Sequence, residues 1–102
     1  MYTIIWQYRV PPERCARFEA TYASDGPWAH LFARSDGFIS VELLRGTESA
    51  GRYMTIDRWR SRAHFAAFKH TFGKEYEMLD RDLDGIADSE TRIGVFETLP
   101  IG

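Results

Sequence analysis

The sequence predicts one α+β domain built from two successive β-α-β units of similar length. Four segments rich in aromatic and β-branched residues indicate strands, and two regions whose apolar residues recur every three or four positions indicate helices. The chain has 102 residues, of which 44% are apolar and 15% aromatic, and this is enough to fill one hydrophobic core. We therefore expect a single domain over residues 1–102.

The first unit begins with a strand over Tyr2–Val10. Pro11 and Pro12 end this strand, because proline donates no backbone hydrogen bond to a neighbouring strand. Since proline is well tolerated in the first turn of a helix, a helix is expected to begin near Pro12. The polar segment 24–27 interrupts the apolar periodicity, which restarts over Trp28–Phe32. The helical region is therefore predicted to be broken in two.

A hairpin follows this helical region. Strands are predicted over Phe38–Leu44 and Arg52–Trp59, because both segments are rich in residues that favour strands. The polar, glycine-bounded segment Gly46–Gly51 supplies the turn between them. A short turn of this kind joins antiparallel strands, so the two segments are expected to pair.

The second helical region carries the strongest periodic signal. Ser61 is a suitable N-cap, because its hydroxyl can accept a hydrogen bond from a free backbone amide of the first turn. Apolar residues then follow at steps of three or four: Phe65, Phe68, Phe72, Tyr76 and Leu79. Gly73 inside this stripe predicts a kink or break, and Asp84-Gly85 ends the helical region. A fourth strand is predicted over Glu90–Thr98.

This order of elements is the ferredoxin-like βαββαβ arrangement, an α+β fold with a four-stranded antiparallel sheet and helices on one face. The first strand alternates two sets of side chains: Ile4, Trp6 and Tyr8 on one face, and Thr3, Ile5 and Gln7 on the other. Neither set is freely soluble, so the uncovered face would leave aromatic residues in water. We therefore expect a homodimer through the sheet face, with a monomer as the alternative.

Composition excludes several partners. The formal net charge is −2, so the chain lacks the electropositive field that attracts phosphate backbones, and no nucleic acid is expected. RNA recognition on the sheet would need basic and aromatic residues together, and Asp36–Ile39 matches such a motif only faintly.

No apolar run approaches the ~18 residues of a membrane span, and the first six residues lack the features of a signal peptide. We expect a cytoplasmic protein that binds no membrane.

The segment Tyr53–Ser61 and the helix after it carry a signature: a strand that ends in Trp59, one residue, a serine, and then an aromatic-rich helix that includes Glu75–Asp80. In the βαββαβ context this signature resembles the antibiotic biosynthesis monooxygenase family of dimeric α/β barrels. The resemblance covers almost the whole chain. It implies a homodimer with a pocket in each subunit, between the helices and the sheet.

The resemblance also implies an activity that needs no cofactor. Some members oxygenate hydroquinone-type or anthrone-type aromatics without metal or flavin: the protein holds a phenol or enol and aids its deprotonation, and the electron-rich anion reduces dioxygen directly. We therefore expect a cofactor-independent monooxygenase-like protein acting on a small electron-rich aromatic or quinol-type metabolite. The alternative is a non-catalytic dimeric α/β barrel that binds a small apolar ligand.

Some positions depart from the family pattern. The family's tryptophan corresponds to Trp59, but the asparagine four residues earlier in oxygenating members is Thr55 here, and their tyrosine on the following helix is Phe65. In a haem-degrading branch of the same fold, the helix carries a second tryptophan and an iron-ligating histidine. These positions fall at Phe68 and near Tyr76. No haem is therefore expected.

The candidate catalytic residues are His64, Trp59 and Arg92. His64 lies four residues before Phe68, at the edge of the inward stripe, and an imidazole suits proton abstraction from an acidic phenol; an exposed surface histidine is the alternative. Trp59 would stack on an aromatic substrate or belong to the core. Arg92 would hold an anionic intermediate or pair with a surface carboxylate. His30 is a second candidate base, at the pocket mouth.

The candidate substrate-binding residues come from the third strand and the two helical regions: Trp28, Tyr53, Thr55, Phe65, Phe68, Phe72 and Tyr76. The aromatic stripe among them can serve as core and as pocket wall together.

No metal is expected, since no two histidines stand four residues apart on a helix. The acidic run over residues 80–88 lacks the spacing of a calcium loop and is expected to be a solvated helix end. Cys15 is expected to be a small buried residue.

Overall fold

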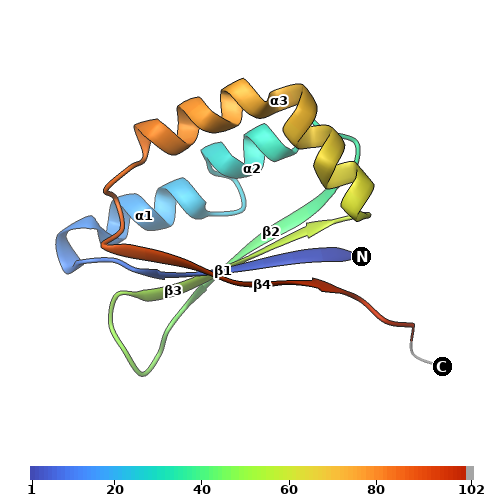
Figure 1. Cartoon of the computed structure of the whole chain (residues 1–102). Helices are drawn as coiled ribbons and strands as arrows, with labels where there is room; N and C mark the ends of the chain where they lie inside the picture. Colours follow the sequence, from blue (N-terminus) through green and yellow to red (C-terminus); the bar gives the residue numbers. More distant parts are fainter. Residues whose placement is uncertain (101–102) are drawn as a thin grey trace.

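The structure is a computed structural model that describes residues 1–100, and it consists of one antiparallel sheet with helices packed on a single face (Figure 1). In chain order the elements are β1 (Tyr2–Arg9), the 3-10 helix η1 (Pro12–Arg14), α1 (Cys15–Tyr22), α2 (Pro27–Phe32), β2 (Phe38–Arg45), β3 (Arg52–Trp59), α3 (Arg62–Asp82) and β4 (Ser89–Glu97). The strands lie in the order β2-β3-β1-β4. The predicted ferredoxin-like order is confirmed, and each predicted strand end lies within one residue of the observed one.

The helices begin and bend where the sequence indicates. The first helical region is broken, and α2 begins at Pro27. Proline has no backbone N–H, and the first turn of a helix does not use this donor within the helix. Before α3, the Ser61 hydroxyl accepts a hydrogen bond from the His64 backbone amide at 3.1 Å. α3 is kinked at Phe72 (φ −112°, ψ 21°), one residue before Gly73. Within residues 1–100 no helix is both long enough and apolar enough to cross a membrane.

β1 lies in the middle of the sheet and determines which side chains meet on the inner face. Trp6 pairs with Thr55 on β3 and with Arg92 on β4, and Tyr8 pairs with Glu90. A register shift beside Trp6 marks a β-bulge between β1 and β4. Because residues in register share a face, the inner face brings together aromatic, hydroxyl and charged groups from adjacent strands.

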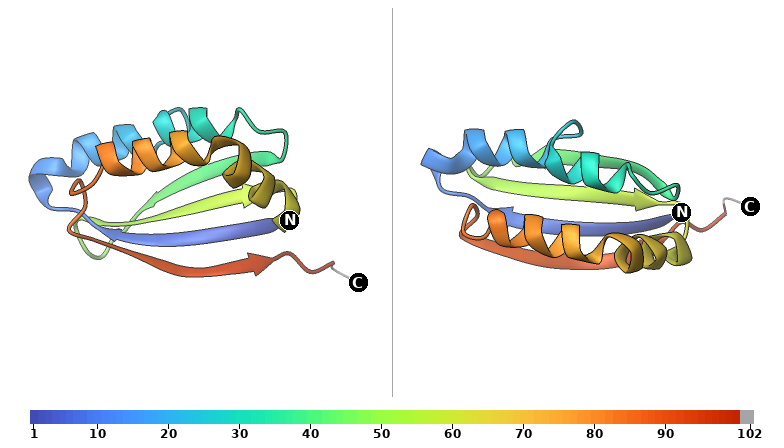
Figure 2. Two further views of the ribbon diagram at one scale, coloured as in Figure 1. Left: turned by 45° about the horizontal axis from the view of Figure 1, so that its top comes forward. Right: turned by 90° about the horizontal axis from the view of Figure 1, so that it is seen from above.

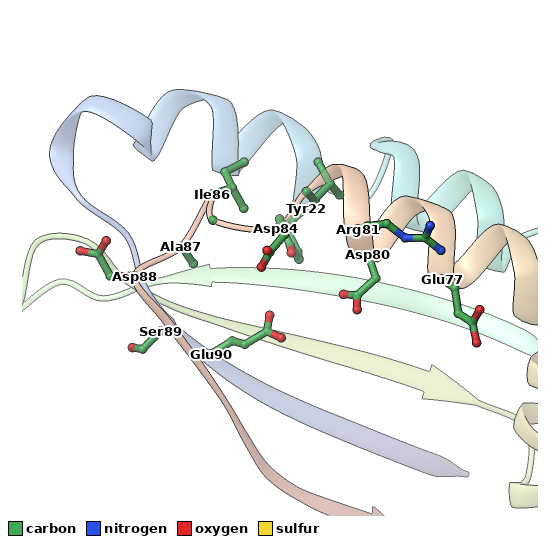
Figure 3. A pocket seen from close by; sticks show the side chains of 12 residues that line it. Tyr22, Glu77, Asp80, Arg81, Asp84, Ile86, Ala87, Asp88, Ser89 and Glu90 are labelled. Atoms are coloured by element: carbon green, nitrogen blue, oxygen red, sulfur yellow. The ribbon is translucent and has the colours of Figure 1, made fainter.

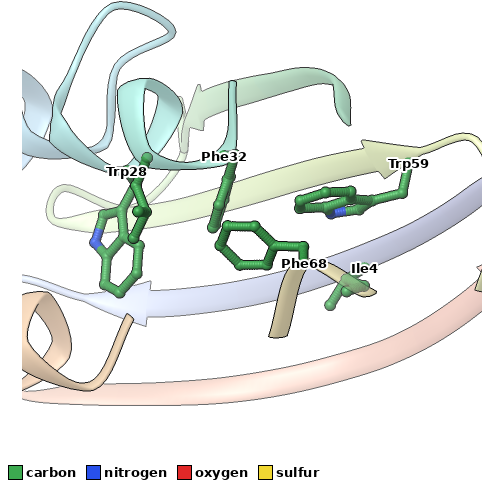
Figure 4. Close-up of a cluster of buried hydrophobic side chains, with 6 residues drawn as sticks. Ile4, Trp28, Phe32, Trp59 and Phe68 are labelled. Carbon is green, nitrogen blue, oxygen red and sulfur yellow. The ribbon is translucent and has the colours of Figure 1, made fainter. Parts of the chain in front are cut away.

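Two aromatic clusters fill the space between the sheet and the helices. The first surrounds Trp59 and Phe68, both 0% exposed, and Figure 4 shows them beside Phe32. The Trp59 ring centroid lies 5.0 Å from that of Phe68 and 5.5 Å from that of Phe32. The second cluster includes Phe18 and Tyr53. The first cluster thus lies at the end of β3 and the second at its start.

The opposite face of the sheet is not covered by helices (Figure 2). The expectation that this face exposes the aromatic residues of β1 is wrong, because Ile4 and Tyr8 belong to the two clusters and Trp6 packs against them. Alternation along β1 and β3 places a different set on the open face: Thr3, Ile5, Gln7, Met54, Ile56 and Arg58. The open face is therefore a mixture of aliphatic and polar side chains, to which β4 adds the exposed ring of Phe96, the register partner of Thr3.

Candidate active site

A cavity lies between the inner face of the sheet and the helices, and it has three adjoining parts. We name the outermost part the vestibule; it has a volume of about 560 Å³ and shares Tyr22, Asp80 and Glu90 with an inner chamber of about 50 Å³. The inner chamber shares Asp57 and Tyr76 with a back chamber of about 150 Å³. The vestibule alone falls within the ~300–1,000 Å³ range of small-molecule sites.

The vestibule is formed by the end of α3, the loop after it and the start of β4 (Figure 3). Gly85 in this loop has a φ of 84°, a left-handed conformation that favours glycine, and it turns the chain from α3 towards β4. Leu83 and Ile86 supply apolar surface. The charged side chains that line the vestibule are Glu77, Asp80, Arg81, Asp84, Asp88 and Glu90. In Figure 3 the carboxylates of Asp80 and Glu90 extend into the space between α3 and the sheet.

Aromatic rings form most of the wall of the inner chamber. Trp6 and Tyr8 come from β1, Tyr22 from α1, Trp28 from α2 and Tyr76 from α3. The ring centroids of Trp28 and Tyr76 are 5.1 Å apart. Burial raises the pKa of Tyr22 and of Tyr76 to about 12, and it raises the pKa of Tyr8 as well. These phenols therefore stay protonated at neutral pH, where they donate hydrogen bonds.

β3 supplies two polar groups to the inner chamber. Thr55 is 2% exposed, and its hydroxyl lies 3.4 Å from the Tyr8 hydroxyl. Asp57 lies two residues further on the same face and pairs in register with Ile4 and Val41, which are both buried and apolar. Within residues 1–100 the structure shows no hydrogen bond or ion pair to the Asp57 carboxylate, and burial raises its pKa to about 7.

Asp57 also lines the back chamber, where the neighbouring charges are basic. Arg92 on β4 and Lys69 on α3 line this chamber with it. Lys69 Nζ lies 3.6 Å from the Tyr76 ring centroid, in cation–π contact. The titratable and charged groups that line the two chambers with Asp57 are Tyr2, Tyr8, Tyr22, Lys69, Tyr76, Asp80, Glu90 and Arg92. Asp57 therefore stands between an acidic and a basic part of the cavity.

The structure brings several of the predicted site residues together. Trp28, Thr55 and Tyr76 line the inner chamber. Phe65, Tyr76 and Arg92 line the back chamber. The predicted anion stabiliser thus lies beside part of the predicted substrate-binding wall, and the roles of these residues stay predictions.

Other predicted site residues lie outside the cavity. Trp59 and Phe68 belong to the first aromatic cluster, and within residues 1–100 the Trp59 indole N–H has no acceptor. The Tyr53 hydroxyl donates a hydrogen bond to Glu19 at 2.5 Å. Phe72 packs on Phe68, with ring centroids 5.7 Å apart. None of these four aromatic residues lines the vestibule, the inner chamber or the back chamber.

The two candidate histidines also lie away from the cavity. His64 is exposed near the start of α3, and its Nδ1 lies 2.7 Å from Ser61 Oγ. Its side chain packs so closely on Gly37 that a Cβ at that position would lie 2.1 Å from His64 Cβ. His30 is exposed on α2. Neither histidine lines any of the three parts, and the role of either as a base stays a prediction.

Sequence reasoning missed the carboxylates of the cavity. Asp57 alternates with Thr55 and Trp59 on β3, and this period of two is the signal that places it on the inner face. Asp80 is exposed near the end of α3, as the sequence predicts, and it also lines the vestibule and the inner chamber. Glu90 begins the fourth strand, and no local pattern shows that the preceding loop brings it under α3.

The described residues of the cavity offer no ligand set for a metal ion and no histidine for haem iron. Within residues 1–100 no group of three or more His, Cys, Asp and Glu side chains is arranged to hold a metal ion. The position that corresponds to the second tryptophan of the haem-degrading branch is Phe68, inside the core, and the position of its iron-ligating histidine falls near Tyr76, a phenol in the inner chamber. The carboxylates of the vestibule would repel haem propionates.

The fold and the cavity together define a small ferredoxin-like α+β protein with a cavity between its sheet and its helices. Residues 1–73 match the family model of antibiotic biosynthesis monooxygenases, and the chain belongs to this family. The resemblance seen in the sequence is thereby confirmed. A search of curated proteins gives no match.

Solved structures share the fold at low sequence identity. A variant of SnoaB, a cofactor-independent oxygenase from Streptomyces nogalater, has a TM-score of 0.78 and 23% identity over 98% of this chain and 94% of that chain. A Deinococcus radiodurans protein of the same family name has a TM-score of 0.77 and 11% identity, over 99% and 95%. A variant of MhuD with two manganese protoporphyrin IX per active site has a TM-score of 0.73 and 23% identity, over 100% and 99%. These likenesses establish the fold.

Proposed function

We propose that this protein is a cofactor-independent monooxygenase that acts on a small electron-rich aromatic or quinol-type substrate. One observation carries the proposal: Asp57, a carboxylate with no hydrogen-bond or ion-pair partner among the described residues, lies in an aromatic chamber between acidic and basic surroundings. A carboxylate whose pKa is near 7 is a better base than an ordinary carboxylate, and it is about half ionised at pH 7 and about nine-tenths ionised at pH 8. Family membership supports the same reaction class.

In the proposed reaction, Asp57 removes the proton of a phenol or enol. Arg92 and Lys69, on the far side of Asp57, stabilise the anion that forms. The anion gives one electron to dioxygen, and the two radicals combine to a peroxide at an electron-rich carbon that bears hydrogen. Loss of water from the peroxide gives the quinone, so that one substrate and one dioxygen yield one quinone and one water. The proton held by Asp57 leaves with the water.

The sizes of the cavity parts suit this arrangement. The vestibule, at about 560 Å³, has room for a substrate ring system, whereas the inner chamber, at about 50 Å³, has room for a substituent such as a hydroxyl group. A ring in the vestibule would therefore insert its hydroxyl towards Asp57. The aromatic wall of the inner chamber excludes water from the reacting oxygen and strengthens the electrostatic contacts there.

The test is oxygen uptake by the purified, metal-free protein with a panel of anthrones and hydroquinones. Heat-inactivated protein and substrate alone serve as controls for spontaneous oxidation. We expect uptake above both controls for at least one member of the panel, with one dioxygen consumed per quinone formed. Uptake that equals the controls across the panel would overturn the proposal.

The second candidate function is non-catalytic binding of a small apolar ligand. Thr55 and Phe65 favour it, because they stand where oxygenating members of the family keep more polar groups. The acidic side chains of the vestibule oppose it, since they are costly to desolvate against an apolar ligand. A thermal shift with neutral aromatic hydrocarbons, without oxygen consumption, would support this candidate.

We also propose that two copies pair through the open face of the sheet. Aliphatic side chains from β1, β2 and β3 lie on this face, including Ile5, Leu44 and Ile56. Light scattering is expected to give twice the mass of one chain. Ile56→Lys is expected to reduce this to the mass of one chain with the fold retained, and a native protein with the mass of one chain would contradict the proposal.

A further inference from the structure

We propose that the vestibule selects aromatic ligands that carry a basic nitrogen, so that the substrate of this site is a phenol or enol with a cationic amine. The inference deepens the proposed function, on which it rests, because it concerns the same cavity. It goes further by naming the charge of the ligand. Binding alone tests it, without turnover.

The side chains that line the vestibule give it a local negative charge. Arg81 is the only cation among the vestibule-lining side chains of residues 1–100, and the other charged side chains there are acidic. Asp88 is paired with Arg14 at 2.9 Å, but in the part of the chain that the structure describes the other vestibule carboxylates have no ion pair. The formal net charge of the whole chain is only −2, so the acidity of the vestibule is a local feature.

β3 contributes a further carboxylate, Asp57, that does not belong to the acidic loop. Asp57 lines the inner chamber, which adjoins the vestibule, and the described residues offer its carboxylate no hydrogen bond or ion pair. The rings around it present faces that attract cations. Tyr76 already accepts Lys69 on its ring at 3.6 Å, and Tyr22 lines both the inner chamber and the vestibule.

Mutual repulsion among the carboxylates points to the same ligand charge. Burial, together with the nearby Asp80 and Asp84, raises the pKa of Glu90. A bound ammonium group would offset this repulsion and would supply several N–H donors to carboxylates that lie apart from one another. Because no group of such side chains within residues 1–100 is arranged to hold a metal ion, an organic cation suits the spacing better than a bare one.

The cavity also suggests how such a ligand would lie. Its hydroxyl would enter the inner chamber towards Asp57, and its ring would contact Leu83 and Ile86 in the vestibule. The basic nitrogen would then lie among Asp80, Glu90 and their acidic neighbours. An aromatic acid in the same pose would place its carboxylate against these groups and be repelled.

The experiment compares three probes that share one ring: tyramine with an ammonium group, tyrosol with an alcohol, and 4-hydroxyphenylacetate with a carboxylate. Binding is measured at pH 7.5 without oxygen, by calorimetry and by quenching of tryptophan fluorescence. We expect tyramine to bind at least tenfold more tightly than tyrosol, and 4-hydroxyphenylacetate to bind more weakly than either. Equal affinity for tyramine and tyrosol, tighter binding of the acid, or no binding of tyramine up to 10 mM would overturn the inference.

Variants locate the selectivity in the vestibule. The double variant Asp80→Asn/Glu90→Gln is expected to lose at least tenfold in affinity for tyramine and less than twofold for tyrosol. The matched control, Asp25→Asn/Glu48→Gln, removes the same charge from exposed positions outside the cavity and is expected to keep the preference. A preference lost equally in both variants would show a general charge effect and overturn the assignment to the vestibule.

Failure of this inference is distinguishable from failure of the proposed function. Selective binding of tyramine by a protein that shows no oxygen uptake with any substrate would leave the inference intact and remove the oxygenase proposal. Oxygen uptake with neutral substrates, by a protein that does not prefer tyramine, would leave the oxygenase proposal intact and overturn the inference about ligand charge.

Discussion

Two neighbouring regions of the inner sheet face, a closed end at Trp59 and a hollow end beside it at Asp57, use the same aromatic residue types for different purposes. At the end of β3, Trp59 and Phe68 are fully buried and pack without a cavity between them. Two residues earlier on the same strand, Asp57 faces chambers that are walled by Trp6, Tyr76 and other rings. The first end is closed and carries no charge, whereas the second is hollow and contains carboxylates. Aromatic residues therefore do not distinguish the proposed site from the core, whereas charged residues do.

The two halves of α3, on either side of the kink at Phe72, contribute differently to these two regions. The half of α3 before Phe72 presents Phe65 and Phe68 to Trp59. The half after it carries Tyr76 and bounds the vestibule, and in Figure 1 α3 lies farther from the sheet towards this end. The first half of α3 thus packs into the aromatic core, and its second half covers the cavity.

The largest expected effect tests the closed end against the hollow end. Trp59→Ala is expected to lower the free energy of unfolding by about 3–5 kcal/mol, because it empties a fully buried site. Trp6→Ala, on the cavity wall, is expected to cause less than half of that loss, because Trp6 is only partly buried. Urea unfolding measures both, and equal losses would contradict the contrast between the two ends.

The next effect concerns the pH dependence of stability at the hollow end. The pKa of Asp57 is raised to about 7 in the folded protein, so between about pH 4 and pH 7 the folded state binds more protons than the unfolded state. Stability is therefore expected to fall as pH rises through this window. Asp57→Asn removes this pH-dependent contribution. The unfolding free energy of the native protein minus that of the variant should therefore decrease by roughly 4 kcal/mol from pH 4 to pH 8. A difference that does not change with pH would place Asp57 in water.

A smaller effect is expected at the basic side of Asp57. Arg92→Gln should slow kcat for oxygen uptake by about tenfold, because the anion loses one of two cations near it, and a tenfold change corresponds to about 1.4 kcal/mol. Arg60→Gln, at an exposed position outside the cavity, is the matched control. Equal rates for the two variants would remove Arg92 from the mechanism.

The smallest effect is expected at His64. With Asp57 as the base, His64→Ala should change the rate of oxygen uptake by less than twofold, since His64 lines no part of the cavity. Circular dichroism would verify that α3 is retained. A tenfold loss in a folded variant would instead support the sequence-based prediction that His64 is the base.

Local signals predict most of the fold and part of the site. The strand ends, the break before Pro27 and the kink near Gly73 all follow from residues next to them in the chain. Period-two alternation on β3 also suffices to place Asp57 on the inner face. The cavity itself depends on how far the second half of α3 lies from the sheet, and that distance results from packing between segments far apart in sequence. The acidic run after Tyr76 is a solvated helix end, as predicted, but local sequence does not predict its position over β4.

The central claim is that the reacting group lies at the hollow end, at Asp57. The most direct measurement is the pH profile of oxygen uptake for the native protein and for Asp57→Asn, with the same substrate and with folding verified for both. A base must be ionised, so the native rate is expected to rise with pH through about 7, and the variant is expected to be slower by about 100-fold or more, without that rise. A folded variant that keeps the native rate and the native profile would contradict the account.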